Sequence, residues 1–265
     1  MAIFEGAGVA IVTPMNDDFS VNYEKLEELI EEQIAEGTDA IVIAGTTGES
    51  SCLSMEEHAD VIKAAVDIVK KRIPVVAGTG SNCTETAIKL TGDAEAAGAD
   101  AALVVSPYYN KASQRGLVAH YSAIADSTKL PIILYNVPGR TGCNILPETV
   151  AELVKTKANI VGIKEATGNV SQAVKVMDLT DGKIDLYSGE DGIVVPLMSI
   201  GAKGVISVWS NVAPKDVHDM CAFAAAGDFG KAAEIQIKGR ALVDALFSDV
   251  NPIPVKTAMN TWARR

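Results

Sequence analysis

The sequence predicts an α/β fold, a (β/α)8 TIM barrel, because a unit of about thirty residues, the length of one βαβ step, recurs along the chain. In each unit a helical pattern closes on a glycine, and an apolar run ending in polar residues follows. Three copies are plain: EGTDAIVIAGTTGE from Glu36, AGADAALVVSPYYN from Ala97 and IGAKGVISVWSN from Ile200. Short, nearly continuous apolar runs are typical of parallel strands covered on both faces.

Apolar runs place the expected strands at 8–14, 39–45, 74–80, 100–107, 131–138, 160–166, 185–190 and 204–210. Alternation of such strands with helices favours the barrel. An open doubly wound sheet is the alternative, but no G-x-G-x-x-G opens a helix after the first strand.

The clearest helix follows Ser54, which is suited to the N-cap, with acidic residues in the first turn and Lys/Arg expected in the last turn. Gly37, Gly98 and Gly201 suit the left-handed position just after a helix. A further helix is expected at about 228–247. The predicted division is a catalytic barrel over residues 1–225 and a C-terminal helical segment over residues 226–265.

Composition points to an enzyme that acts on small molecules. The 265 residues carry 23 basic and 34 acidic side chains, a net charge of −11, which argues against nucleic acid and anionic membranes as partners. The N-terminus lacks a basic region and an apolar run long enough for a signal peptide or a membrane span. Four scattered cysteines without a C-x-x-C are typical of reduced thiols, so we expect a cytoplasmic protein.

In such barrels the active site lies at the carboxyl ends of the strands. The polar residues expected there are Thr46, Thr47, Glu49, Tyr108, Tyr109, Asn110, Tyr135, Asn136, Arg140, Lys164, Glu165, Ser188, Gly189 and Glu190. The three histidines are scattered singly and no phosphate-binding glycine loop is present, so the sequence predicts neither a metal nor a nucleotide cofactor.

Lys164 is the strongest candidate for chemistry because it lies inside the apolar strand VGIKEA. Side chains alternate along a strand, so Gly162, Lys164 and Ala166 share one face. With that face turned inward, the two small residues would leave room for the lysine stem. Burial disfavours the ammonium form of a lysine and would leave a nucleophilic amine. The alternative is a lysine that reaches the rim or pairs with Glu165 or Glu190.

Other strand ends supply polar groups that each admit two interpretations. Tyr135 in ILYNVP is either an interior tyrosine with a satisfied hydroxyl or a proton carrier. Arg140 in VPGRTG is either solvated or suited to bind a carboxylate in bidentate fashion. Thr46 and Thr47 in AGTTGES could bind an anion or relay a proton, or simply form a turn. A buried lysine without metal ligands favours imine chemistry on a keto acid.

Motifs along nearly the whole chain then show a resemblance to a known family. They are GTTGES at Gly45, SPYYN at Ser106, YNVPGRTG at Tyr135, GIKEATGN at Gly162, SGED at Ser188, GVISV at Gly204 and NPIPVK at Asn251. In this order they resemble the 4-hydroxy-tetrahydrodipicolinate synthase (dihydrodipicolinate synthase) family of the N-acetylneuraminate lyase and class I aldolase superfamily. Lyases of that superfamily that cleave sugar acids usually have another residue at the position of Arg140.

The resemblance implies a lyase that condenses pyruvate with L-aspartate 4-semialdehyde to 4-hydroxy-tetrahydrodipicolinate, in lysine and diaminopimelate biosynthesis. Lys164 would form a covalent imine with pyruvate, and no cofactor would be needed. Tyr135 would carry protons, helped by Thr46 and by Tyr109 from a neighbouring subunit. Substrate-binding groups would be Thr47 and the backbone at Gly189 and Ile206 for pyruvate, and Arg140 for the semialdehyde carboxylate. The implied assembly is a homotetramer made of two tight dimers.

Two departures from the family pattern carry further expectations. Ser50, His58, Asn82 and Tyr108 match the site at which many members bind inhibitory lysine, but Met55 and Thr86 replace a histidine and a glutamate. Without that carboxylate the effector's ammonium group loses a partner, so weak or absent lysine inhibition is expected. Family members also continue with further helical turns after NPIPVK. The chain therefore looks truncated, which could expose apolar surface, loosen the barrel or change the assembly.

Two other functions are compatible with the sequence. One is a related aldolase or lyase acting on a 2-keto-3-deoxy sugar acid or a hydroxy-oxo acid, which shares the imine chemistry. The other is a folded but catalytically weak scaffold that results from the short C-terminus.

Overall fold

Eight parallel strands close into a barrel within residues 2–263, the part of the chain that a computed structural model describes. The strands are β1 (Gly6–Ala10), β2 (Ala40–Ile43), β3 (Val75–Gly78), β4 (Ala101–Val105), β5 (Ile132–Asn136), β6 (Ile160–Glu165), β7 (Asp185–Ser188) and β8 (Gly204–Ser207). Each strand pairs with the next, and β8 closes the ring on β1, with Val205 beside Ala7. The predicted (β/α)8 barrel is confirmed.

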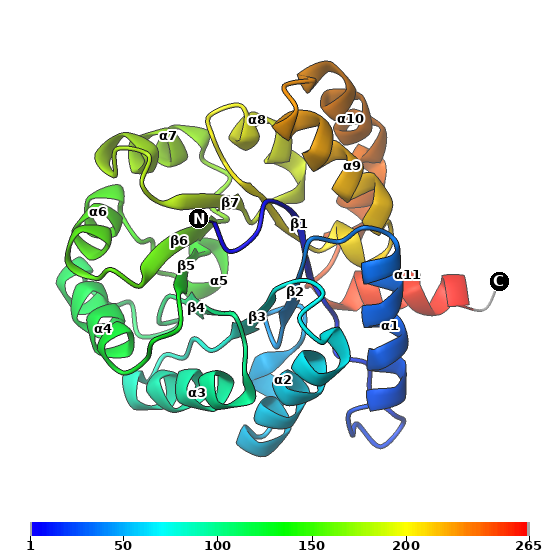
Figure 1. The fold of residues 1–265 in the computed structure, drawn as a ribbon, viewed down its shortest axis with the longest axis horizontal. Helices are drawn as coiled ribbons and strands as arrows, with labels where there is room; N and C mark the ends of the chain where they lie inside the picture. Colours follow the sequence, from blue (N-terminus) through cyan, green and yellow to red (C-terminus); the bar gives the residue numbers. More distant parts are fainter. Residues whose placement is uncertain (1, 264–265) are drawn as a thin grey trace.

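Most helices form a ring around the strands in chain order, while the short α5 lies inside that ring and α11 runs out from it toward the C-terminus (Figure 1). They are α1 (Tyr23–Ala35), α2 (Met55–Val69), α3 (Thr84–Ala97), α4 (Gln114–Asp126), α5 (Pro138–Thr141), α6 (Pro147–Thr156), α7 (Val170–Leu179), α8 (Val194–Met198), α9 (Pro214–Ala225), α10 (Phe229–Leu246) and α11 (Ile253–Ala263). Three 3-10 turns, η1 (Ser50–Cys52), η2 (Asp191–Ile193) and η3 (Trp209–Asn211), complete the described elements. The division at residue 225 stays a prediction, and of the segment 226–265 the last two residues lie outside the described part.

Several local features match the sequence-based expectations. Ser54 forms a capping box with Glu57 at the start of α2, which satisfies two backbone N–H groups of the first turn. Gly37, Gly98 and Gly201 adopt φ values of 92°, 90° and 100° after their helices, a region that glycine enters without steric cost.

Most expected strands extend two to four residues past the observed ends, as at β8, which ends at Ser207 rather than at residue 210. Two of the wrong boundaries have a clear cause. The first strand ends at Ala10 rather than at residue 14, because the chain leaves the sheet there: the Val12 N–H donates to Asn211 Oδ1, and Pro14 has no N–H to offer a ladder. Helix α2 ends at Val69 and has no basic residue in its last turn. Lys70 and Lys71 follow it in left-handed conformations (φ 51° and 60°), so they turn the chain toward β3 instead of extending the helix.

Alternating side chains divide the apolar residues into two clusters. On β2, Ala40 and Val42 belong to the cluster inside the barrel, whereas Ile41 and Ile43 belong to the larger cluster between strands and helices. The interior cluster begins with Phe4, which lies ahead of β1 at the amino end of the strands, where Figure 1 shows the N-terminus over the barrel. The carboxyl ends of the strands therefore remain as the open side of the barrel.

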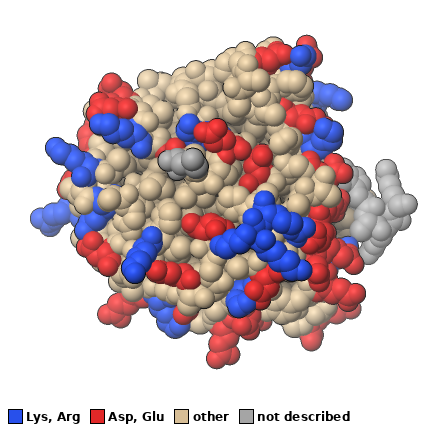
Figure 2. All heavy atoms as spheres, in the orientation of Figure 1, with Lys and Arg blue, Asp and Glu red and all other residues tan. Residues whose placement is uncertain are grey.

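On the surface, basic and acidic side chains are mixed over the face drawn in Figure 2. Within the described chain no helix combines the length and the apolar character that a membrane crossing needs.

Candidate active site

Lys164 lies inside the barrel near the carboxyl end of β6, with only 6% of its surface exposed. In register it stands between Tyr135 on β5 and Tyr187 on β7. Its Nζ lies 4.3 Å from the centroid of the Tyr135 ring. Among residues 2–263, no Asp or Glu carboxylate lies within ion-pair distance of this amine, so the alternative pairing with Glu165 or Glu190 is not found. A lysine buried without such a partner is unusual in a protein interior.

Space for the Lys164 stem depends on Gly189, which follows β7. A Cβ at Gly189 would lie 2.7 Å from Ala166 Cβ, closer than real Cβ contacts, and 3.0 Å from Lys164 Cγ and Cε, tighter than most. Gly162, which we expected to make this room, faces Ile133 instead. The pattern of alternation identified the correct face, but the glycine that leaves room for the lysine follows the neighbouring strand β7.

Glu165, the next residue along β6, faces the opposite way. Its buried carboxylate accepts hydrogen bonds from the Thr167 backbone N–H (2.8 Å), Asn136 Nδ2 (3.1 Å) and Gln172 Nε2 (3.2 Å). Three donors satisfy most of the carboxylate's acceptor capacity. Glu165 therefore ties β6 to β5 and α7 and does not face the lysine.

Thr46 and Thr47 follow β2 in a loop with strained backbone, because Ala44 and Glu49 both adopt left-handed conformations (φ 51° and 56°). Thr46 is half-buried. Thr47 is 2% exposed, and its Oγ1 accepts a hydrogen bond from Asn251 Nδ2 at 2.9 Å.

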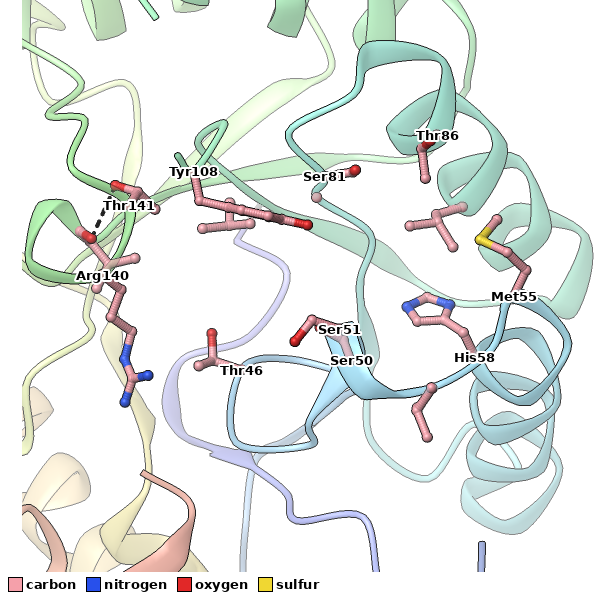
Figure 3. Close-up of a pocket in the computed structure, with 15 residues that line it drawn as sticks. Thr46, Ser50, Ser51, Met55, His58, Ser81, Thr86, Tyr108, Arg140 and Thr141 are labelled. Carbon is pink, nitrogen blue, oxygen red and sulfur yellow. Dashed lines mark hydrogen bonds between the residues drawn. The ribbon is translucent and has the colours of Figure 1, made fainter. Parts of the chain in front are cut away.

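A cleft of about 380 Å³ opens above the strands, and Figure 3 shows its two ends. Arg140, on the short helix α5, and Thr46 lie at one end, and Tyr108 lies between the ends. His58 and Met55 of α2 and Thr86 of α3 line the other end. The cleft thus joins the predicted carboxylate-binding arginine to the predicted lysine-effector region.

Tyr109 is the expected catalytic residue whose side chain lies in the open, whereas Tyr135 contacts Lys164. The Tyr109 side chain is 87% exposed, and its backbone is left-handed (φ 70°), a strained conformation for a tyrosine. Ile206, by contrast, is buried in the interior cluster on β8.

Electrostatics around the site involve two acidic residues that follow Gly189. Burial raises the pKa of the Glu190 carboxyl, and the neighbouring charge of Asp191 raises it further. Burial also raises the pKa of Asp191, although hydrogen bonds from the backbone N–H groups of Val208 and Trp209 (both 3.0 Å) and the charge of Lys164 oppose that shift. Sequence analysis assigned no role to Asp191, which joins the β7 and β8 loops.

Sequence analysis also assigned no role to Asn251, which contacts Thr47 and Arg140 from the far end of the chain. The motif NPIPVK marked its position but not its contacts. Within residues 2–263, His, Cys, Asp and Glu form no group of three or more that could hold a metal ion.

Comparisons with known proteins agree on one family. Residues 3–263 match the Dihydrodipicolinate synthetase family. A 4-hydroxy-tetrahydrodipicolinate synthase of Lachnoclostridium phytofermentans is 57% identical over 260 residues, which are 98% of this chain and 88% of that protein. The crystal structure of the chloride-inhibited dihydrodipicolinate synthase from Acinetobacter baumannii, complexed with pyruvate, is 50% identical with a TM-score of 0.95, covering 97% of this chain and 88% of that one. A synthase structure from Cyanidioschyzon merolae with lysine bound is 38% identical with a TM-score of 0.95, covering 98% and 89%.

Proposed function

The chain belongs to the dihydrodipicolinate synthetase family, and from that membership we propose that it condenses pyruvate with L-aspartate 4-semialdehyde to 4-hydroxy-tetrahydrodipicolinate. The observation that carries the proposal is the amine of Lys164, buried in the barrel beside Tyr135 without a carboxylate partner among the described residues. This reaction is a step toward diaminopimelate and lysine, and it makes the enzyme a lyase of the class I aldolase type.

The chemistry begins when the Lys164 amine attacks the ketone carbon of pyruvate. Loss of water from the resulting carbinolamine gives a protonated imine, which acts as the electron sink that a cofactor would otherwise supply. A methyl proton then leaves, and the enamine attacks the aldehyde carbon of the semialdehyde, which forms the new carbon–carbon bond. The semialdehyde's own amino group displaces Lys164 from the imine, closes the ring and restores the free lysine.

Tyr135 is proposed to move the protons of these steps, because its ring packs against the lysine amine. Thr46, which lines the cleft together with Arg140, would relay them to solvent. Thr47 and the backbone at Gly189 and Ile206 are proposed to hold pyruvate. Arg140 would bind the semialdehyde carboxylate through its planar, two-pronged guanidinium.

Reductive trapping tests the central step. Borohydride added with pyruvate should reduce the imine to a stable secondary amine, which peptide mass spectrometry should locate on Lys164. The Lys164→Ala variant should take up no pyruvate, whereas Lys155→Ala, on the exposed side of α6, should be modified as the wild type is. An unmodified Lys164 in folded wild-type protein would sink the proposal and would favour the inactive scaffold.

Arg140 decides between the synthase and a related aldolase. The Arg140→Ala variant should still form the imine with pyruvate, but its turnover with the semialdehyde should fall by about 10² because a charge-assisted pair is lost. Wild-type turnover should be far higher with the semialdehyde than with sugar-acid aldehydes. The reverse preference would assign the chain to the sugar-acid or hydroxy-oxo-acid aldolases.

We also propose that the active unit is a homo-oligomer, a tetramer made of two tight dimers, in the cytoplasm. Support comes from Tyr109, which is exposed in the single chain, from the exposed apolar residues Phe229 and Ile237 of α10, and from four free cysteines. Mixing the Tyr109→Ala and Lys164→Ala variants should restore activity, because mixed dimers contain sites with both residues intact. If each variant is inactive alone and the mixture is inactive as well, Tyr109 does not act across subunits.

We propose that lysine inhibits the enzyme weakly or not at all, because of the residues at the end of the cleft that α2 and α3 line. Met55 and Thr86 lie there beside His58, and no acidic residue is among the described residues that line the cleft. The effector's ammonium group therefore lacks a carboxylate partner. Inhibition assays with lysine should show little effect on the wild type and a clear gain in the Thr86→Glu variant; submillimolar inhibition of the wild type would contradict the proposal.

A further inference from the structure

The connection between α10 and α11 crosses to the mouth of the barrel and delivers Asn251 into it. Asn251 lies 204 positions from Thr47 in the sequence and is 6% exposed. Its side chain and its main chain serve different partners. The amide Nδ2 donates to Thr47 Oγ1 at 2.9 Å, and the main-chain carbonyl accepts from the Arg140 guanidinium at 3.3 Å. The Arg140 side chain extends from α5 toward this segment (Figure 3).

The bond to Thr47 determines what the hydroxyl can do next. A threonine hydroxyl has one proton to donate and can accept on its oxygen. Because Asn251 Nδ2 is the donor, the Thr47 oxygen is the acceptor, and the hydroxyl proton stays available. The side chain of Thr47 makes no other hydrogen bond within residues 2–263. A buried hydroxyl held in this way is prepared to donate to an anion, such as the carboxylate of a keto acid.

The amide oxygen of Asn251 supports the same interpretation. Asn251 Oδ1 is buried and has no hydrogen-bond partner among the described residues. A buried acceptor without a partner reduces stability, so an arrangement that served stability alone would be expected to satisfy it. The asparagine therefore gives up part of its own hydrogen bonding while it directs the Thr47 hydroxyl.

The same C-terminal segment also fastens the strained loop that contains Thr47. Lys256, in the first turn of α11, donates to Glu49 Oε1 (2.6 Å) and to the Thr13 carbonyl (3.0 Å). Glu49 has the left-handed backbone described above, a conformation that persists only where surrounding contacts hold it. Two independent contacts from residues 251–256 thus hold a loop that the barrel strands alone leave strained.

We propose that Asn251 is a positioning residue that orients the Thr47 hydroxyl toward pyruvate through its side chain and holds Arg140 through its main-chain carbonyl. The inference rests on the proposed function, since it assigns Thr47 to the pyruvate carboxylate. It makes an asymmetric prediction. Replacing the side chain removes the support of Thr47 but leaves the carbonyl that holds Arg140, so pyruvate binding should suffer more than semialdehyde binding.

The experiment measures borohydride trapping at Lys164 as a function of pyruvate concentration, together with KM for each substrate. In Asn251→Ala the half-saturating pyruvate concentration should rise about ten-fold, the effect of losing one typical hydrogen bond, while KM for the semialdehyde changes less than about two-fold. In the nearly isosteric Asn251→Asp, the carboxylate can only accept hydrogen bonds. It should compete with pyruvate for the Thr47 hydroxyl proton and weaken pyruvate binding more strongly than Asn251→Ala does. The matched control is Ile253→Ala, an exposed residue of the same segment that should behave as the wild type does.

A double-mutant cycle separates positioning from general damage. In a Thr47→Val background, Asn251→Ala should have almost no further effect on pyruvate binding, because the hydroxyl that Asn251 orients is already absent. Three outcomes would overturn the inference. They are losses of pyruvate affinity that add in the double variant, equal losses of affinity for the two substrates, and a half-saturating pyruvate concentration in both Asn251 variants that equals the wild-type value. If Asn251→Ala does not fold, Asn251→Asp decides alone. Failure of wild-type trapping would instead refute the proposed function, so the two failures are distinguishable.

Discussion

The two ends of the barrel interior are made by the same strands, yet one is closed and the other reactive. At the amino end the Phe4 ring stacks on Tyr187 with centroids 4.5 Å apart, and the Tyr187 hydroxyl donates to the Phe4 carbonyl at 2.9 Å. At the carboxyl end Lys164 has no ion-pair partner among the described residues, and Asn251 Oδ1 is buried without a hydrogen bond.

The difference teaches how two residues, Tyr187 on β7 and Gly189 just after it, separate stability from chemistry. Tyr187 points to the closed end, where its hydroxyl is satisfied and its burial raises its pKa. Gly189, two residues later, has no side chain at all, and that absence admits the lysine. At the closed end the Tyr187 hydroxyl is satisfied by the protein itself, whereas at the open end Lys164 is left without an ion-pair partner among the described residues.

The largest expected effect comes from opening the closed end. Phe4→Ala removes a buried ring and should lower the free energy of unfolding by about 4 kcal/mol, measured by urea denaturation. Activity per folded molecule should change less than about two-fold, because Lys164 is not touched. The control is Phe19→Ala, the same substitution at a side chain that is 81% exposed. Lost activity with unchanged stability would contradict the division between the two ends.

At the open end, Gly189→Ala should place a methyl group 3.0 Å from Lys164 Cε and displace the amine. A displacement of about 1 Å at a reacting group can cost about 10²-fold in rate, which we expect for imine formation in stopped trapping assays. The methyl group also approaches Ala166 Cβ at 2.7 Å. Adding Ala166→Gly should therefore recover stability but not rate. Full recovery of the rate would mean that Gly189 serves packing only.

A suitable control for that variant is Gly92→Ala on α3, where the added Cβ meets nothing within 4 Å. This change should leave imine formation unaltered and slightly favour the helix.

The Glu165→Gln variant tests whether a residue that is adjacent to Lys164 in the sequence, but faces away from it, takes part in the chemistry. The new amide group would oppose the donors of Asn136 and Gln172, so the free energy of unfolding should fall by about 2 kcal/mol. Trapping at Lys164 should persist in the folded fraction. The exposed Glu152→Gln is the matched control, with no expected change. If trapping collapsed while stability held, Glu165 would belong to the chemistry after all.

Much of this site was predictable because its signals are local. A lysine within an apolar strand and the alternation of side chains were enough to place Lys164 inside the barrel, and the run of βα units determined the architecture. The boundaries of β1 and α2 were not predictable from those signals. The end of β1 depends on the side chain of Asn211, 199 positions from Val12, and the end of α2 depends on the left-handed backbone of Lys70 and Lys71.

Contacts between distant segments are the part that local patterns cannot reach. No periodicity indicates that Asn251 meets Thr47, or that Gly189 rather than Gly162 clears the lysine stem, because each depends on how strands are set side by side. Tyr109 shows the same limit, since the single chain leaves its side chain exposed.

The smallest expected effect lies outside the barrel and separates the pH dependence of stability from that of turnover. His120 on α4 places Nδ1 2.9 Å from Thr84 Oγ1, and its Nε2 is buried without a partner among the described residues. Burial lowers the pKa of His120 from its ordinary 6.5 to about 4. Between those values the unfolded chain binds a proton that the folded chain does not, so stability rises with pH through this window and is lost as the pH falls toward 4.

The comparison of wild type with His120→Gln isolates this contribution from the carboxylates that titrate in the same range. Above pH 6.5 the difference in unfolding free energy between the two proteins should be constant. Below it, the wild type should lose about 2 kcal/mol relative to the variant, because only the wild type has the buried imidazole to protonate. Trapping at Lys164 per folded molecule should be equal in both proteins at each pH. A difference that stays flat down to pH 4 would show that the folded chain accepts the proton at His120.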